Sequence, residues 1–165
     1  MTTERRRLKE EGDALDLLQG EHRSLLASLE ALRAGGARGR SASRKLASAC
    51  EALQRHAQIE LELFYPLLRG RPGLDDLLDA ARVEHKTMQE LIVELIDGKR
   101  RDGLRAAHVE ALAMYAAHHF RDEEENLFPA ARAGGIDLNA LGRRIAQRRA
   151  ELEVEDYPEC REPSA

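Results

Sequence analysis

The sequence predicts an all-α protein: an antiparallel up-down-up-down four-helix bundle with a short accessory C-terminal helix. Leu, Ala, Glu and Arg dominate the 165 residues, while β-branched and aromatic residues form no short alternating runs. Apolar residues recur with helical spacing in four long stretches, which glycine- or proline-containing breaks separate. A chain of this length suits one domain with its own hydrophobic core.

The first two helices are predicted on either side of the glycine-rich segment 35–40. The first begins near Asp13, and its apolar stripe is Leu15, Leu18, Leu25, Leu29 and Leu32. Ser41 or Ser43 is predicted to cap the second helix, which ends at the glycines of segment 70–73. The buried stripe of the second helix is predicted as Leu46, Ala49, Leu53, His56, Glu60, Leu63 and Leu67.

The remaining helices follow from the same spacing. The third stripe, closed by Gly98, is Leu74, Leu78, Ala81, His85, Met88, Ile92 and Leu95. The fourth, which ends before Gly134, is Leu112, Tyr115, His119, Glu123 and Asn126. Asp137 is predicted to cap the accessory helix, whose apolar residues are Leu138, Leu141, Ile145 and Leu152.

The domain organisation predicted from these elements has four parts. Residues 1–12 are expected to be a flexible N-terminus, 13–133 the bundle, and 134–153 the accessory helix. Residues 154–165, which contain two prolines, are expected to be a disordered tail.

Charge and composition argue against several classes of partner. The formal net charge is −4 with both signs mixed, which is not the one-sided basic surface of a nucleic-acid-binding protein. No apolar run approaches the ~20 residues of a bilayer-spanning helix, and the N-terminal stretch lacks the apolar segment of a signal peptide. We therefore expect a cytoplasmic protein without nucleic-acid or membrane partners. Cys50 and Cys160 are far apart in the sequence and are expected to be free thiols.

A repeat relates the two halves of the predicted bundle. We call two residues repeat-mates when their numbers differ by 63, and at the positions that matter most both members of a pair are of the same type. These pairs are Glu21 and Glu84, His22 and His85, His56 and His119, Glu60 and Glu123, and Pro66 and Pro129. The first and second helices therefore form one copy of a helical hairpin, and the third and fourth form another. Two hairpins packed about a pseudo-twofold axis would each give one ligand set to a shared pair of metal ions.

The repeated histidines and glutamates have the spacing of metal ligands. In each His-x-x-x-Glu pattern the two side chains lie one turn apart on the same helix face. A single inward histidine is more often a hydrogen-bonded core residue, but buried glutamates would cost several kcal/mol each without a cation nearby. Donor sets of imidazole and carboxylate without thiolate favour iron or manganese over structural zinc. The predicted ligands are His22, His56, Glu60, His85, His119 and Glu123.

Four segments of the chain resemble a known family. LLQGEHRSLL, HAQIELELFYPLL, VEHKTMQEL and HHFRDEEENLFPAA are similar to the ligand-bearing stretches of hemerythrin-like proteins, also described as HHE cation-binding domains. The resemblance covers about residues 13 to 133. It implies two iron ions (Fe2+/Fe3+), bridged by the carboxylates of Glu60 and Glu123 and by an oxo or hydroxo group, although manganese or zinc would also suit these donors.

The resemblance implies a function and departs from the family at one position. Oxygen-carrying hemerythrins have a further histidine one turn after the third-helix ligand, where this chain has Gln89, and its repeat-mate is Leu26. This favours an iron-binding, sensing or redox role over reversible oxygen carriage. The leading hypothesis is a protein that binds or responds to dioxygen, nitric oxide, peroxide or the iron and redox state, as a sensor, carrier or iron buffer with an unknown protein partner.

Two other functions are weighed against this hypothesis. One is a di-iron redox enzyme such as a peroxide-decomposing protein, although the sequence shows no pocket for an organic substrate. The other is a metal-free helical interaction protein, which would fold equally well after chelation.

Several neighbouring residues are assigned other roles or left open. His118 competes with His119 as a ligand if the helix contains a bulge, and His108 lies three turns away. Tyr115 is expected either to line the pocket or to be a core aromatic. An apolar plug below the metals, flanked by prolines that kink or end their helices, is predicted from Phe64, Tyr65, Leu127 and Phe128. The residues assigned mainly to a solvated face are Glu62, Asp122, Glu124 and Glu125.

Overall fold

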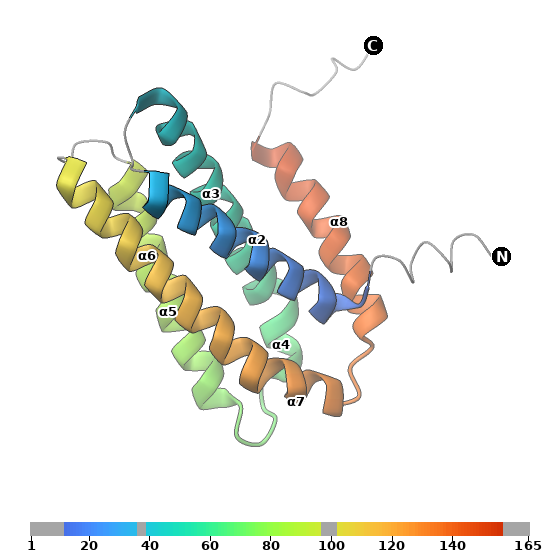
Figure 1. Cartoon of the computed structure of the whole chain (residues 1–165). Coiled ribbons are helices and arrows are strands. Elements are labelled where there is room, and N and C mark those ends of the chain that lie inside the picture. The colour runs from blue at the N-terminus through green and yellow to red at the C-terminus, as the bar shows by residue number, and fades with distance from the viewer. Residues whose placement is uncertain (1–11, 36–38, 97–101, 157–165) are drawn as a thin grey trace, which may run out of the picture.

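The computed structural model describes residues 12–35, 39–96 and 102–156, and it confirms an all-α bundle (Figure 1). Its helices are α2 (Ala14–Gly35), α3 (Gly39–Ile59), α4 (Tyr65–Leu68), α5 (Asp75–Ile96), α6 (Asp102–Asp122), α7 (Phe128–Ala133) and α8 (Leu138–Asp156). Two π-helical turns, η1 (Glu60–Phe64) and η2 (Glu123–Leu127), join α3 to α4 and α6 to α7. The predictions for residues 1–11, Gly98, segment 157–165 and Cys160 lie outside the described residues.

Four helical arms run alternately up and down (Figure 1). The arms are α2, α3 with α4, α5, and α6 with α7. Each packs on two neighbours, because α2 contacts α3 and α6 while α5 contacts α6 and α3. The fifth helix, α8, lies against α2, α3 and η1 and therefore covers one side of the bundle. No helix of the described segments is long and apolar enough to cross a membrane.

The first helix begins where the sequence predicts, and one of the two predicted caps, Asp137, is confirmed. The Asp13 carboxylate accepts hydrogen bonds from the backbone N–H groups of Leu15 (2.9 Å) and Asp16 (3.1 Å). The Asp137 carboxylate accepts one from the N–H of Ala140 at 2.8 Å. The predicted cap at Ser41 or Ser43 is wrong, because α3 begins at Gly39 and both serines lie inside it.

The hydrophobic core has two parts with a polar layer between them. One part contains Leu18, Phe64 and Leu78, and the other contains Leu25, Leu53 and Met88. Each histidine predicted as a ligand lies in its helix at the boundary between the two parts. His22, for example, lies between Leu18 in one part and Leu25 in the other. The polar layer therefore crosses the whole bundle at one height.

Each π turn shifts the buried face by one residue. Pro66 has no N–H to donate to the carbonyl four residues earlier, and its ring would clash with that carbonyl in a regular helix. The N–H of Tyr65 instead bonds to the carbonyl of Glu60, five residues back. Leu63 and Leu67 are consequently half-buried, and the residues after them, Phe64 and Leu68, fill the core. The predicted stripe is wrong beyond Glu60 for this reason.

The stripe predicted for the fourth arm is also wrong at two positions, Asn126 and Tyr115. At η2 the N–H of Phe128 bonds to the carbonyl of Glu123, so Asn126 is exposed and Leu127 is buried instead. Tyr115 is 45% exposed, because the buried stripe passes through its neighbour Ala116. Tyr115 therefore neither lines a metal pocket nor belongs to the core.

Candidate metal centre

The structure brings all six predicted ligand residues together in the polar layer. Their side chains come from all four arms, and none is more than 6% exposed. In the described part of the chain no other histidine, aspartate or glutamate is buried to this degree. The repeat therefore places its six polar members around one point.

Glu60 lies between two pairs of histidines. Its Oε1 atom is 3.0 Å from His56 Nε2 and 3.5 Å from His22 Nε2. Its Oε2 atom is 3.2 Å from His85 Nε2 and 3.8 Å from His119 Nε2. One carboxylate thus offers one oxygen to each pair, which is the arrangement of a bridging ligand.

Glu123 has a less symmetric place. Its Oε2 atom is 3.3 Å from His22 Nε2 and 3.7 Å from His119 Nε2, while its Oε1 atom accepts a 2.6 Å hydrogen bond from the hydroxyl of Tyr65. Tyr65 also stacks on the ring of His85, with centroids 5.6 Å apart. Tyr65 was predicted as part of an apolar plug, and its bond to the carboxylate of Glu123 was not predicted. The two groups of converging donors are His22, His56, Glu60 and Glu123, and Glu60, His85 and His119.

Three outer carboxylates hold the far nitrogens of the histidine rings. His56 Nδ1 is 2.8 Å from Glu21, and His119 Nδ1 is 2.7 Å from the repeat-mate Glu84. His22 Nδ1 is 2.8 Å from Glu124, which is therefore not simply a residue of the solvated face. A carboxylate on Nδ1 orients the ring and leaves Nε2 free for a metal. The pairing of Glu21 with Glu84 in the repeat was a signal of this role.

The inner atoms of the site have no hydrogen-bonding partners within the described structure. They are the Nε2 atoms of all four histidines, both oxygens of Glu60 and Oε2 of Glu123. Buried polar atoms are almost always hydrogen-bonded, because an unpaired one costs about 1–3 kcal/mol. Seven such atoms converging on one point fit a cation site, since a cation satisfies lone pairs without any hydrogen bond.

Comparison with known proteins agrees with this geometry. The chain matches the hemerythrin HHE cation binding domain over residues 13–131. It belongs to that family. Searches of curated proteins and of solved structures returned no match. The buried histidine and glutamate clusters of this hemerythrin HHE domain are suited to a carboxylate-bridged metal site.

Charges within the HHE domain site shift its pKa values strongly in the absence of metal. Burial alone lowers the pKa of His56, but the charge of Glu60 and the hydrogen bond to Glu21 outweigh it and raise the pKa to about 10. Burial is likewise outweighed at His119, where Glu60 and Glu84 raise the pKa to about 10.

Glu60 shows the opposite shift to the one that burial alone predicts. Burial raises its pKa, but His56, His119 and His22 outweigh burial and hold the pKa well below its usual range. Without metal, Glu60 therefore stays ionised, because the imidazoles that face this carboxylate outweigh its burial.

The other two histidines lie away from the converging donors of the HHE domain. His118 is 60% exposed, with Nδ1 3.3 Å from Asp122 and 3.7 Å from Glu84. His108 is bonded to the carboxylate of Glu94, and its Nδ1 is 2.7 Å from the carbonyl of Leu104. Because the π turn begins only at Glu123, the helix is regular between His119 and that residue. His119 therefore faces inward and His118 does not.

The hydrogen bond from Tyr65 gives a testable prediction about stability. Burial, with the charges of Glu60 and Glu123, raises the pKa of Tyr65, so its hydroxyl stays protonated and donates. Tyr65→Phe leaves the buried Oε1 of Glu123 without this donor, and we expect metal-free protein to lose about 1.5–3 kcal/mol of unfolding free energy. Urea denaturation measures the loss, with the exposed Tyr115→Phe as the matched control. Equal stability of the two variants would contradict a role for this bond.

Proposed function

We propose that the chain binds two non-haem iron ions, one beside His22 and His56 and the other beside His85 and His119. The observation that carries this proposal is the position of Glu60, whose two oxygens face different histidine pairs at 3.0–3.8 Å. Glu123 adds an oxygen near one histidine of each pair. Two ions that share carboxylates explain why four histidines face one carboxylate.

The donor chemistry supports iron. Nitrogen and carboxylate donors without thiolate suit iron and manganese, whereas structural zinc sites usually include cysteine. Cys50 is buried in the hydrophobic core, and burial raises its pKa to about 11, which keeps the thiol protonated. Manganese and zinc remain competitors for the same donors.

We further propose that the centre binds or responds to dioxygen, nitric oxide, peroxide or the redox state, as a sensor or iron buffer. Bound iron would supply Lewis-acid and one-electron redox chemistry. Gln89 stands where oxygen carriers have a further histidine, and its side-chain oxygen instead accepts a 3.1 Å hydrogen bond from Gln54. The protein donors are thus fewer than in a carrier, which supports a reactive or responsive site more than a storage site for dioxygen.

Metal content tests the dinuclear assignment. Protein reconstituted with Fe2+ under anaerobic conditions should hold about two ions per chain by elemental analysis. His56→Ala and His119→Ala should each lower the content by about one ion or more, because they are repeat-mates that face Glu60. His108→Ala, whose side chain points elsewhere, is the control. Full metal content in both ligand variants would contradict the assignment.

Absorption spectroscopy tests the response to small molecules. Anaerobic iron-loaded protein is exposed separately to dioxygen, nitric oxide and peroxide, and at least one should change the spectrum. The same additions to Glu60→Ala should leave it unchanged, because this variant lacks the shared carboxylate. Unchanged spectra of the loaded wild type with all three would contradict the proposal, while repeated consumption of peroxide would make the centre an enzyme.

A further inference from the structure

The two halves of the centre differ in one outer contact. Three histidines hold a carboxylate on Nδ1, but Nδ1 of the buried His85 has no hydrogen-bonding partner among the described residues. Its repeat-mate His22 is held by Glu124, and the repeat-mate of Glu124 is Leu61. Both residues occupy the second position of a π turn, directly after Glu60 or Glu123. A leucine therefore stands where symmetry places the fourth outer carboxylate.

A second difference concerns the packing around the same two rings. One stacking contact is the same in both halves. Phe128 stacks on His22 and its repeat-mate Tyr65 stacks on His85, each with ring centroids 5.6 Å apart. His22 is also covered by Phe120, with centroids 4.1 Å apart and nearly parallel planes. The repeat-mate of Phe120 is Ala57, which is too small to cover His85.

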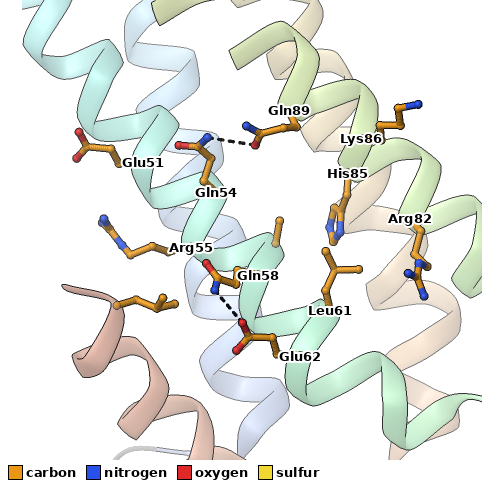
Figure 2. A pocket seen from close by; sticks show the side chains of 12 residues that line it. Glu51, Gln54, Arg55, Gln58, Leu61, Glu62, Arg82, His85, Lys86 and Gln89 are labelled. Atoms are coloured by element: carbon orange, nitrogen blue, oxygen red, sulfur yellow. Dashed lines mark hydrogen bonds between the residues drawn. The ribbon is translucent and has the colours of Figure 1, made fainter. Parts of the chain in front are cut away.

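On the side of its ring that no second aromatic covers, His85 borders a cavity. A cavity of about 740 Å³ is lined by His85, Leu61, Ala57 and Gln89, among others. Figure 2 shows Leu61 on η1 directed toward the ring of His85 on α5, with the hydrogen-bonded pair Gln54 and Gln89 beside them. A smaller cavity of about 170 Å³ borders His56, but that histidine is held by Glu21, which Arg149 of α8 contacts in turn.

We propose that the two metal positions are unequal, and that the ion beside His85 and His119 exchanges readily while the ion beside His22 and His56 is retained. An outer carboxylate orients its histidine and raises the ligand's basicity, and loss of such a partner typically costs about 10- to 100-fold in metal affinity. Water or a chelator can reach His85 through the cavity, whereas Phe120 shields His22. The inference rests on the proposed dinuclear site.

Release of iron to a chelator tests the inequality. Protein loaded with Fe2+ under anaerobic conditions is mixed with excess ferrozine, and the coloured complex is followed over time. We expect two phases of equal amplitude, with rates that differ by about 10-fold or more. A single phase for both ions would overturn the inference even if the protein holds two ions.

Exchanging the two repeat-mates provides matched variants. Leu61→Glu gives His85 a carboxylate and should slow the fast phase by about 10-fold or more, while Glu124→Leu should accelerate the slow phase to a similar degree. Leu61 is 38% exposed, so a glutamate there has access to solvent and is compatible with folding. Fast and slow phases that neither variant changes would assign the inequality to another cause and overturn the inference.

Metal content before chelation separates this inference from the proposed function. A chain that holds a single ion contradicts the dinuclear proposal. The unequal surroundings of the two histidine pairs then still predict where the ion lies: His56→Ala should remove it and His85→Ala should not. Removal by His85→Ala alone would overturn the inference as well.

Discussion

Replacing Glu60 with glutamine is expected to release both metal ions, the largest effect of any single substitution in the chain. The neutral amide matches the carboxylate in size but cannot offer a charged oxygen to each histidine pair. Each oxygen of Glu60 lies within 3.8 Å of the Nε2 atoms of one histidine pair, so this single substitution affects both metal positions. The loss of affinity should exceed about 100-fold, the upper range for losing only an outer partner. Elemental analysis of reconstituted protein measures it.

The control for this variant is Glu125→Gln. Glu125 is an exposed member of η2, so its substitution removes the same charge without touching the site. Circular dichroism of both variants would establish that the helices remain. Two ions bound by Glu60→Gln would contradict the bridging role, and a loss of metal in Glu125→Gln would indicate an effect of net charge only.

The second large effect is expected in the pH dependence of stability. Without metal, the raised pKa values of His56 and His119, about 10 in place of 6.5, keep both imidazoles protonated near neutral pH beside the ionised Glu60. These charges stabilise the metal-free fold. Metal needs neutral imidazoles, so binding must displace their protons.

The direction in which stability changes with pH follows from the difference in pKa between the folded and unfolded states. A histidine whose pKa is raised in the folded state contributes full stability below 6.5 and loses it as the pH rises toward about 10. Glu60, whose pKa is lowered, contributes full stability above 4.5 and loses it as the pH falls. The metal-free protein should therefore be most stable between pH 4.5, above which Glu60 contributes fully, and pH 6.5, below which the two histidines contribute fully. Metal binding, by contrast, strengthens as the pH rises.

Thermal melts of loaded and metal-free protein test this expectation. The gap in Tm should be small below about pH 6, where protons compete for the ligands, and should widen toward about pH 8.5. Loading at pH 7 should release about two protons per chain, from His56 and His119, which a weakly buffered indicator dye can count. An equal Tm gap at every pH, with no proton release, would mean that these histidines do not bind the metal.

Helical periodicity and the repeat were sufficient to predict the fold and to bring the six polar residues together. All predicted stripe residues within α2 and α5 are buried, and the first residue of the third stripe, Leu74, lies just before α5 and is partly buried. The repeat also distinguished His119 from His118, because only His119 stands 63 positions after another histidine, His56. The buried stripes and the choice of His119 depend only on the spacing of residues along the chain, so they could be predicted from the sequence.

What the sequence did not reveal depends on helix geometry and on contacts between helices. The shift after Glu60 requires knowing that Pro66 is accommodated by a widened turn and does not end the helix. The bonds from Tyr65 to Glu123 and from His22 to Glu124 join residues 58 and 102 positions apart. The lowered pKa of Glu60 depends on its distances to His56, His119 and His22, since burial alone predicts the opposite sign.

The π turns constrain how the chain can change in length. Each turn holds one surplus residue between a ligand glutamate and the proline six positions later. Deleting one residue there would let the helix close regularly with Phe64 still facing the core, but the ring of Pro66 would then clash with the carbonyl four residues earlier. Inserting one residue would instead rotate everything beyond it by about 100°, which would turn Tyr65 away from Glu123 and Phe64 out of the core. Insertions and deletions are therefore expected to be tolerated in the connections between arms, such as 69–74, and not in the two short spans from glutamate to proline.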